Sequence, residues 1–521
     1  MSRSQFLSNR IVILDFGSQY TQLIARRVRE AGVFSEILPH TAPLEIVTRN
    51  GTKGIIFSGG PASVFKRAAP KCDPGIFTAG IPILGICYGM QLMAHMLGGS
   101  VIRGDKREYG LTKIFFNRRS QLFNGLVMDA ALTVWMSHWD QVIRMPEGFS
   151  AVAHSDNTDI VAMEDDKRQF YALQFHPEVM HTDSGRDILN NFVYTICNAE
   201  KTWSLQSYAE FSIENIRGVV GDSRVVCALS GGVDSSVTAI LIHRAIGNKL
   251  KCVFVNNGVL RQGEPEKVVK IFKEKLELPL IYFDASSRFL RKLKGINDPE
   301  KKRKIIGSEF ISAFEYVIKK NNLSDVKFLA QGTLYPDVIE STSFRGPSAK
   351  IKSHHNVGGL PKRLKFKLIE PLRELFKDEV RVIGRHLGVP DEILKRHPFP
   401  GPGLAVRIIG EITKKRLEIL KRADLIVEEE LRMSGEYDKT WQGFVVLLPV
   451  KSVGVMGDKR SYSNVVALRC VNSVDGMTAN WSKIPYDILA RISTRIVNEV
   501  DDVNRVVYDI TNKPPGTIEW E

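Results

Sequence analysis

The feature that most constrains this chain is a pattern that occurs twice: an apolar run, a glycine-rich turn, and a helix-forming stretch. Near the beginning, apolar runs cover 10–15, 54–57 and 81–85, with a helical stretch over 19–31. Further along, apolar runs over 224–229 and 251–256 flank a predicted helix over 235–245. Such repetition predicts an α/β fold with parallel sheets covered by helices on both faces. Ligands of these sheets bind at the carboxyl ends of the strands.

Length and pattern together predict three domains. A chain of 521 residues is too long for one hydrophobic core. We expect two doubly wound parallel-sheet domains, over 8–201 and 202–395, and a small α+β domain over 396–521. The polar stretch 200–208 is the predicted linker between the first two, and a Pro- and Gly-rich stretch, 397–403, closes the second. In the third domain we expect helices over 416–431 and 486–500 and strands over 444–449 and 463–471.

The composition is typical of a soluble globular protein, with 43% apolar and 25% charged residues. The apolar runs are too short for a membrane span and residues 1–9 lack a signal-peptide pattern, so we expect a cytoplasmic protein with no membrane partner. Six cysteines without paired spacing argue against a zinc ribbon or a disulfide scaffold. The formal charge of +14 suits anionic ligands, either nucleic acid or small phosphorylated molecules.

One cysteine has the context of a nucleophile. Cys87 lies between two glycines in the sequence Gly-Ile-Cys-Tyr-Gly, after an apolar strand and before a predicted helix over 90–97. This is the nucleophile-elbow arrangement with sulfur in place of oxygen. The start of the following helix favours the thiolate. The other five cysteines are interpreted as buried thiols.

A base and an oxyanion site are also predicted. His176 and Glu178 follow an apolar run in Gln-Phe-His-Pro-Glu, which we expect to be a strand ending at His176. His176 would accept the thiol proton and Glu178 would hold the imidazole. Backbone N–H groups of Gly59, Gly60 and Tyr88 would hold the oxyanion. These residues resemble the class I glutamine amidotransferase family, over roughly 8–200, whose Cys, His and Glu triad maps onto Cys87, His176 and Glu178.

The second sheet carries a candidate phosphate site. The loop Ser230-Gly231-Gly232-Val233-Asp234-Ser235-Ser236 follows a strand and opens a helix, and it lacks the Gly-Lys-Ser/Thr of a P-loop NTPase. It resembles the N-type ATP pyrophosphatase family, in which this PP-loop binds the pyrophosphate released from ATP. The resemblance implies that residues 230–236 bind ATP and that Mg²⁺ accompanies the nucleotide. Asp234 either takes part in that arrangement or caps the helix; its metal ligands are not predicted.

Nearly the whole chain then resembles the GMP synthetase family. The resemblance rests on Gln331–Ser341, on the lid-like stretch 351–359, and on the final segment Lys-Pro-Pro-Gly-Thr-Ile-Glu-Trp-Glu. It implies conversion of XMP, ATP, glutamine and water to GMP, AMP, pyrophosphate and glutamate, through a cysteine thioester and adenylated XMP. It also implies a homodimer formed by the third domain, no nucleic-acid partner, and XMP contacts from Lys513, Thr517, Ile518 and Glu519.

Two alternatives stay open on the sequence. The same two domains would serve a PP-loop amidotransferase that acts on another acceptor, such as a tRNA base or deamido-NAD. The basic stretches 288–304 and 362–367 would favour the tRNA, whose binding would weaken steeply with salt. The other is a non-catalytic nucleotide sensor or RNA-binding regulator, which the complete set of catalytic motifs disfavours.

Overall fold

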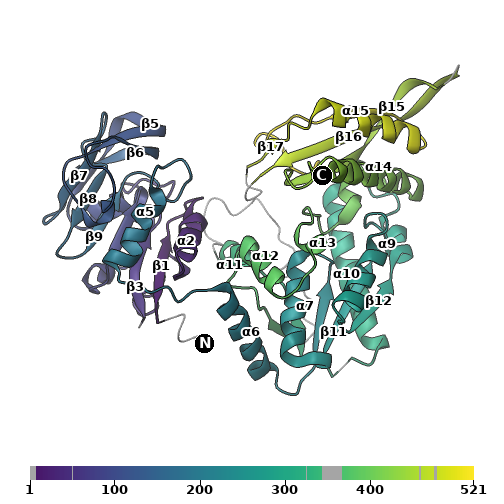
Figure 1. The fold of residues 1–521 in the computed structure, drawn as a ribbon, viewed down its shortest axis with the longest axis horizontal. Coiled ribbons are helices and arrows are strands. Elements are labelled where there is room, and N and C mark those ends of the chain that lie inside the picture. Colours follow the sequence, from purple (N-terminus) through teal and green to yellow (C-terminus); the bar gives the residue numbers. More distant parts are fainter. Residues whose placement is uncertain (1–7, 50, 324, 343–365, 457–458, 474–477) are drawn as a thin grey trace. The chain divides into compact units, whose positions relative to one another are not determined.

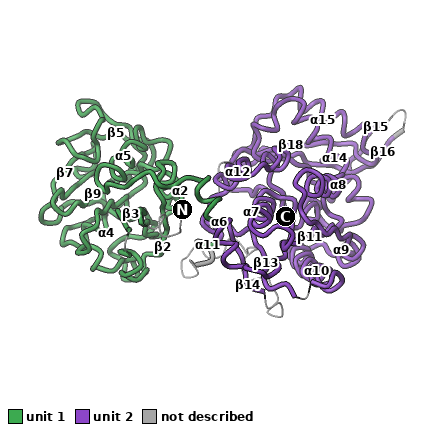
Figure 2. The backbone as a smooth tube through the Cα atoms, turned by 60° about the horizontal axis from the view of Figure 1, so that its bottom comes forward, with its two compact units in different colours: residues 1–211, 338–352 green, residues 212–337, 353–521 purple. Residues whose placement is uncertain are grey.

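The computed structural model describes residues 8–49, 51–323, 325–342, 366–456, 459–473 and 478–521 (Figure 1). The predicted lid-like stretch 351–359 lies outside these residues. The chain divides into two compact units, residues 1–211 with 338–352 and residues 212–337 with 353–521 (Figure 2). The described helices include none long and apolar enough to cross a membrane.

The first unit contains a nine-stranded sheet in the order β2-β1-β3-β4-β9-β8-β7-β5-β6. The five strands from β2 to β9 are parallel, as the sequence predicts. The other four strands, β8, β7, β5 and β6, run antiparallel. The sequence analysis did not predict them, because it recognised no alternation of apolar and polar residues there. The strands are β1 (Arg10–Asp15), β2 (Phe34–Pro39), β3 (Thr52–Phe57), β4 (Ile83–Ile86), β5 (Ser100–Phe116), β6 (Leu132–Arg144), β7 (Ser150–Ser155), β8 (Ala162–Asp165) and β9 (Phe170–Leu173).

The second unit contains a five-stranded parallel sheet in the order β12-β11-β10-β13-β14. Helices α7 (Val233–Ile246) and α10 (Pro299–Lys320) both pack against it, on either side of β11 (Figure 1). This confirms the parallel sheet expected from the repeated pattern. The strands are β10 (Val225–Leu229), β11 (Leu250–Asn256), β12 (Leu280–Asp284), β13 (Phe328–Ala330) and β14 (Lys367–Ile369).

A four-stranded sheet completes the second unit. Strands β15 (Gln442–Met456) and β16 (Lys459–Asn472) pair antiparallel. Beside β16, the short strand β17 (Asn480–Trp481) pairs antiparallel and β18 (Val503–Tyr508) pairs parallel. Helices α14 (Lys414–Met433) and α15 (Tyr486–Glu499) cover it. The predicted α+β content of the final segment is therefore confirmed, with both strands longer than expected.

The remaining helices connect these sheets. They are α2 (Thr21–Glu30), α3 (Leu44–Val47), α4 (Tyr88–Met96), α5 (Gly185–Asn190), α6 (Leu205–Val220), α8 (Glu264–Lys270), α9 (Ser286–Leu293), α11 (Tyr335–Thr342), α12 (Lys377–His386) and α13 (Asp391–Leu394). Because α6 begins at Leu205, the predicted linker 200–208 is wrong in its second half. Residues 205–208 form the first turn of the amphipathic helix α6.

The two sheets of the second unit share one hydrophobic core. A continuous apolar cluster runs from Val226 and Val253 of the parallel sheet, through Leu404 and Ile408, to Leu468 of the final sheet. The short 3₁₀ helix η6 (Gly403–Arg407) lies at this junction. Sequence patterns mark strands and helices but not which faces pack together, so they did not predict this shared core. The predicted boundaries 8–201, 202–395 and 396–521 themselves stay a prediction.

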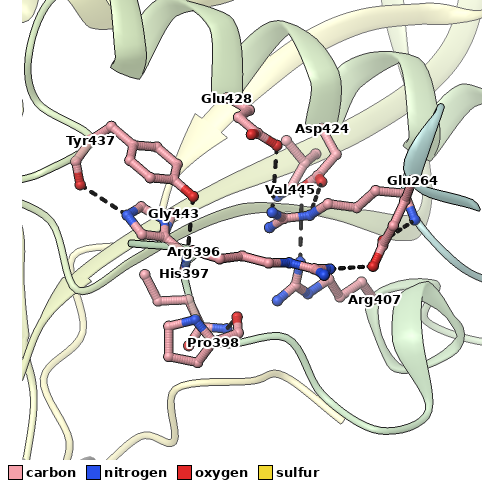
Figure 3. A network of polar contacts seen from close by, with 12 residues as sticks. Glu264, Arg396, His397, Pro398, Arg407, Asp424, Glu428, Tyr437, Gly443 and Val445 are labelled. Atoms are coloured by element: carbon pink, nitrogen blue, oxygen red, sulfur yellow. Dashed lines mark hydrogen bonds and ion pairs between the residues drawn. The ribbon is translucent and has the colours of Figure 1, made fainter. Parts of the chain in front are cut away.

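His397 occupies this junction as a neutral imidazole (Figure 3). Its Nδ1 accepts the Gly443 amide at 3.1 Å, so that nitrogen carries no proton. Its Nε2 lies 2.9 Å from the Tyr437 carbonyl oxygen, and the two rings stack at 3.7 Å. Burial lowers the pKa of His397 to about 4, because a charged ring would be desolvated and would have to give up the Gly443 bond.

We predict a loss of stability on acidification that depends on His397. The unfolded histidine has a pKa of about 6.5, so between about pH 6.5 and 4 the unfolded chain binds a proton that the folded chain does not. The free energy of unfolding should fall as pH drops through this window, by at most about 1.4 kcal/mol per pH unit. In His397→Asn, which keeps an acceptor for Gly443, denaturant unfolding from about pH 7 to 5 should show a shallower slope. Equal slopes would contradict a neutral buried imidazole.

Candidate active sites

Cys87 lies at a strained turn between β4 and α4. Its backbone has φ 51° and ψ −105°, a conformation that L-residues rarely adopt. The glycine at 89 is required by space, because a Cβ there would lie 2.6 Å from the Phe57 carbonyl oxygen. The turn brings the thiol to the start of α4, and the residue remains 6% exposed. The elbow predicted from the sequence is present.

His176 and Glu178 are brought to this thiol. His176 Nδ1 lies 2.8 Å from Glu178 Oε1, and both side chains are buried. With Nδ1 engaged, Nε2 is the ring nitrogen left for the Cys87 sulfur, which interacts with His176 closely enough to raise its pKa. Burial alone would lower the pKa of His176, but the Glu178 carboxylate and the Cys87 sulfur raise it well above its usual value. The ring therefore accepts the thiol proton readily.

The strand before His176 ends earlier than expected. β9 stops at Leu173, so His176 lies in the loop beyond it rather than at the strand end. The Trp135 carbonyl accepts the His176 amide at 3.0 Å, and Thr182 Oγ1 donates to the His176 carbonyl at 2.6 Å. These two hydrogen bonds hold the main chain of His176 in place although it lies in a loop.

Of the predicted oxyanion residues, Gly59 borders the thiol directly, and Tyr88 follows Cys87 in the chain. A Cβ on Gly59 would lie 3.1 Å from His176 Cε1 and 3.7 Å from Cys87 Cβ, so the Gly59 backbone borders the reacting groups. A Cβ on Gly60 would lie 2.6 Å from the Phe16 carbonyl oxygen. Tyr88 is the first residue of α4, where an amide has no acceptor within the helix. The arrangement suits an oxyanion, although its use as one stays a prediction.

Strand β6 supplies site residues that the sequence analysis missed. The Ser137 carbonyl oxygen lies 3.7 Å from Cys87 Sγ, and the Asp140 carbonyl accepts a bond of 2.8 Å from Gln91 Nε2 on α4. Beside them His138 Nε2 lies 2.9 Å from the buried Glu108. These are mostly main-chain contacts from an antiparallel strand, and no side-chain motif announces them.

The loop 230–236 closes on itself through its serines. Ser236 Oγ donates to the Gly232 carbonyl at 2.6 Å, and Gly232 N donates to Ser230 Oγ at 3.3 Å. Gly231 has φ +75°, and a Cβ there would lie 2.8 Å from Val268. Residues 230–232 precede α7 and residues 233–236 form its first turn, so the loop includes the helix N-terminus, which favours anions. Arg396, which the sequence analysis did not single out, donates to the Gly231 carbonyl at 3.1 Å and pairs with Glu264 (Figure 3).

Asp234 is half-buried, and one of its oxygens, Oδ1, is shielded from solvent without a partner. Among the described residues, its Oδ1 accepts no hydrogen bond. Burial raises its pKa, opposed by Lys377 and reinforced by Asp337. The residue before α7 is Gly232, and no side chain caps the helix, so the structure gives no support to the capping alternative. A half-buried carboxylate that interacts with a second one suits a site that receives a cation with a phosphate ligand.

The segment 513–519 is held by internal contacts. Lys513 pairs through its backbone with Ala479, and the Thr517 carbonyl accepts from Arg469 at 3.0 Å. Ile518 joins an apolar cluster, and Glu519 binds Arg407 through two bonds of 2.9 and 3.1 Å. The segment is thus ordered rather than frayed. XMP contacts at these four residues stay a prediction.

Comparisons with known proteins cover nearly the whole chain. The class-I glutamine amidotransferase family matches residues 12–196, the GMP synthase C terminal domain matches 429–520, and a tRNA methyl transferase HUP domain matches 223–271. A GMP synthase [glutamine-hydrolyzing] of Carboxydothermus hydrogenoformans is 56% identical over 99% of this chain and 100% of that protein. The Aquifex aeolicus protein of the same name is 57% identical, over 98% and 99%. The crystal structure of a glutamine amidotransferase from Thermotoga maritima is 18% identical over 37% of this chain and 99% of that one, with a TM-score of 0.31.

We predict that Gly59→Ala impairs the thiol site selectively. The new methyl group would lie 3.1 Å from the His176 ring and displace it from Cys87. Because misplacement by an ångström costs up to about 100-fold in rate, a shift of a few tenths of an ångström should lower glutamine hydrolysis by about threefold or more. Gly307→Ala in α10, where a Cβ meets nothing within 4 Å, is the control and should keep full activity. Unchanged hydrolysis in Gly59→Ala would show that Gly59 does not border the reacting groups.

Proposed function

The chain belongs to the family of glutamine-hydrolysing GMP synthases, and we propose that its thiol site releases ammonia from glutamine for use at the loop 230–236. It is a ligase that forms a C–N bond, aminating XMP to GMP while ATP becomes AMP and pyrophosphate. The observation that carries the division of labour is the presence, on one chain, of a Cys–His–Glu triad and a pyrophosphate-type loop. Other acceptors, such as a tRNA base or deamido-NAD, are not favoured.

At the first site we assign the catalytic roles to Cys87, His176 and Glu178. The Cys87 sulfur attacks the carboxamide carbon of glutamine, while its proton resides on His176 Nε2. That proton then passes to the leaving amine, so ammonia departs and a γ-glutamyl thioester remains. Glu178 fixes Nδ1 and stabilises the imidazolium. Water, deprotonated by His176, hydrolyses the thioester to glutamate, with amides of Gly59, Gly60 and Tyr88 holding the oxyanion.

At the second site we assign residues 230–236 to ATP. Serine hydroxyls, glycine amides and the N-terminus of α7 would hold the pyrophosphate portion of the nucleotide. The carbonyl oxygen of XMP attacks the α-phosphate, pyrophosphate departs, and ammonia then displaces AMP. Asp234, whose Oδ1 lacks a partner among the described residues, would hold Mg²⁺ together with Asp337. When bound, that ion neutralises charge on the pyrophosphate.

The remaining assignments rest on the family resemblance and on surface features. We place XMP against Lys513 and Thr517, with Ile518 and Glu519 completing its contacts. A homodimer through the final sheet agrees with exposed apolar side chains on the β15–β16 hairpin, including Val453, Val455 and Tyr462. We also propose a cytoplasmic location.

We predict that Cys87→Ala abolishes GMP formation from glutamine, while ammonium ions still support it. Loss of the nucleophile removes only the first half-reaction. Cys72→Ala is the matched control: its thiol is equally buried at 6% exposure, and burial raises its pKa to about 12, which leaves it inert. Both nitrogen donors should work in that variant. Equal losses with glutamine and ammonium in Cys87→Ala would rule out two separate sites.

Asp234→Asn should abolish amination with either nitrogen donor. The amide keeps the shape of the carboxylate but removes the charge that a magnesium–nucleotide complex needs. Pyrophosphate release with XMP, ATP and ammonium is the measurement. Asp391→Asn, an exposed first-turn carboxylate of α13, is the control and should behave as wild type. Normal ammonium-driven turnover in Asp234→Asn would refute the ATP assignment.

A further inference from the structure

Three cations with fully buried side chains meet the segment 509–521. They are Lys302, Arg407 and Arg469, each 0% exposed. They come from α10, η6 and β16, which are distant in sequence. Charged side chains are almost never fully buried unless they are paired. These buried pairings therefore constrain where the segment can lie, unlike ion pairs on the surface.

Lys302 uses its three N–H donors on two parts of the structure. Its Nζ donates to the carbonyl oxygens of Ala405 at 3.2 Å and Ile408 at 2.7 Å, at the end of η6. The third partner is Glu521 Oε2 at 2.5 Å. An ammonium group has three donors, and all three are used here. Lys302 therefore joins α10 and η6 to Glu521.

The contacts to the segment recur at every second residue. Arg469 donates a hydrogen bond to the main-chain carbonyl of Thr517. Arg407 donates to the carboxylate of Glu519. Lys302 donates to the carboxylate of Glu521. Ile518, between the first two, lies in the apolar cluster with Phe444 and Val446. The three contacts to cations and the apolar contact of Ile518 therefore hold the end of the segment at four successive points.

We propose that the Lys302–Glu521 ion pair positions the segment 513–519 for XMP, with both residues acting as positioning rather than catalytic residues. This rests on the proposed function, which assigns Lys513 and Thr517 to XMP. Arg407 and Arg469 hold the segment at 519 and 517, and the Lys302–Glu521 pair holds it beyond them. The loop 230–236 is held separately, by its own serines and by Arg396. Loss of the pair should therefore affect XMP and spare ATP.

The test uses the full chain with ammonium as nitrogen donor, so the thiol site is not involved. Glu521→Gln, Lys302→Met and the double variant Lys302→Met/Glu521→Leu are compared with wild type. The double variant replaces a buried ion pair by apolar groups, which proteins often tolerate. We expect KM for XMP to rise about tenfold or more in each variant, with KM for ATP unchanged within about twofold. Lys301→Met, on the same helix, is the matched control and should leave both unchanged.

Thermal unfolding separates positioning from general damage, and Lys513→Met tests the premise. If Lys513→Met raises KM for XMP but folded Glu521→Gln and the double variant do not, the positioning role is refuted and the XMP assignment stands. If Lys513→Met also leaves KM for XMP unchanged, both the positioning role and the assignment of this segment to XMP are refuted. Equal rises in KM for XMP and ATP would likewise overturn the inference, because a purely structural pair would affect both substrates.

Discussion

Close approach between backbones at the carboxyl ends of parallel strands is the constraint on which both sites depend. At the thiol site, α4 approaches β3 so closely that a Cβ at residue 89 would lie 2.6 Å from the Phe57 carbonyl oxygen. At the nucleotide loop, a Cβ on Gly332 would lie 3.2 Å from the backbone of Asp234. One helix therefore begins directly against the end of β3, and the other against the residues that follow β13. Their unpaired amides face the edge of the sheet where ligands of such folds bind.

The two sites treat buried charge differently. His176 is provided with both a carboxylate and a sulfur, so its protonated form is stabilised within the protein. Asp234 lacks a partner for Oδ1 among the described residues, and burial raises its pKa. The first site is complete before substrate binds, as a nucleophile must be. The second, as proposed, would be completed by a cation and an anionic nucleotide.

The sequence predicted what local chemistry determines. The elbow at Cys87 and the loop 230–236 need glycine and short polar residues at fixed spacing, and such spacing is visible without a structure. What it missed depends on contacts distant in the chain. The β6 carbonyls reach Cys87 only after an antiparallel strand folds back, and Arg396 reaches Gly231 across 165 positions. The shared core of the second unit is also invisible in the sequence, because apolar patterns show that a face is buried but not against what.

The account stands on Cys87 acting as the acyl acceptor for glutamine in a chain that uses the released ammonia elsewhere. The direct measurement is mass spectrometry of the acid-quenched enzyme after brief mixing with glutamine, followed by peptide mapping. The account predicts a γ-glutamyl adduct on the peptide that contains Cys87, labile to hydroxylamine as a thioester is. An adduct on another residue, with Cys87 unmodified while glutamate accumulates, would contradict it.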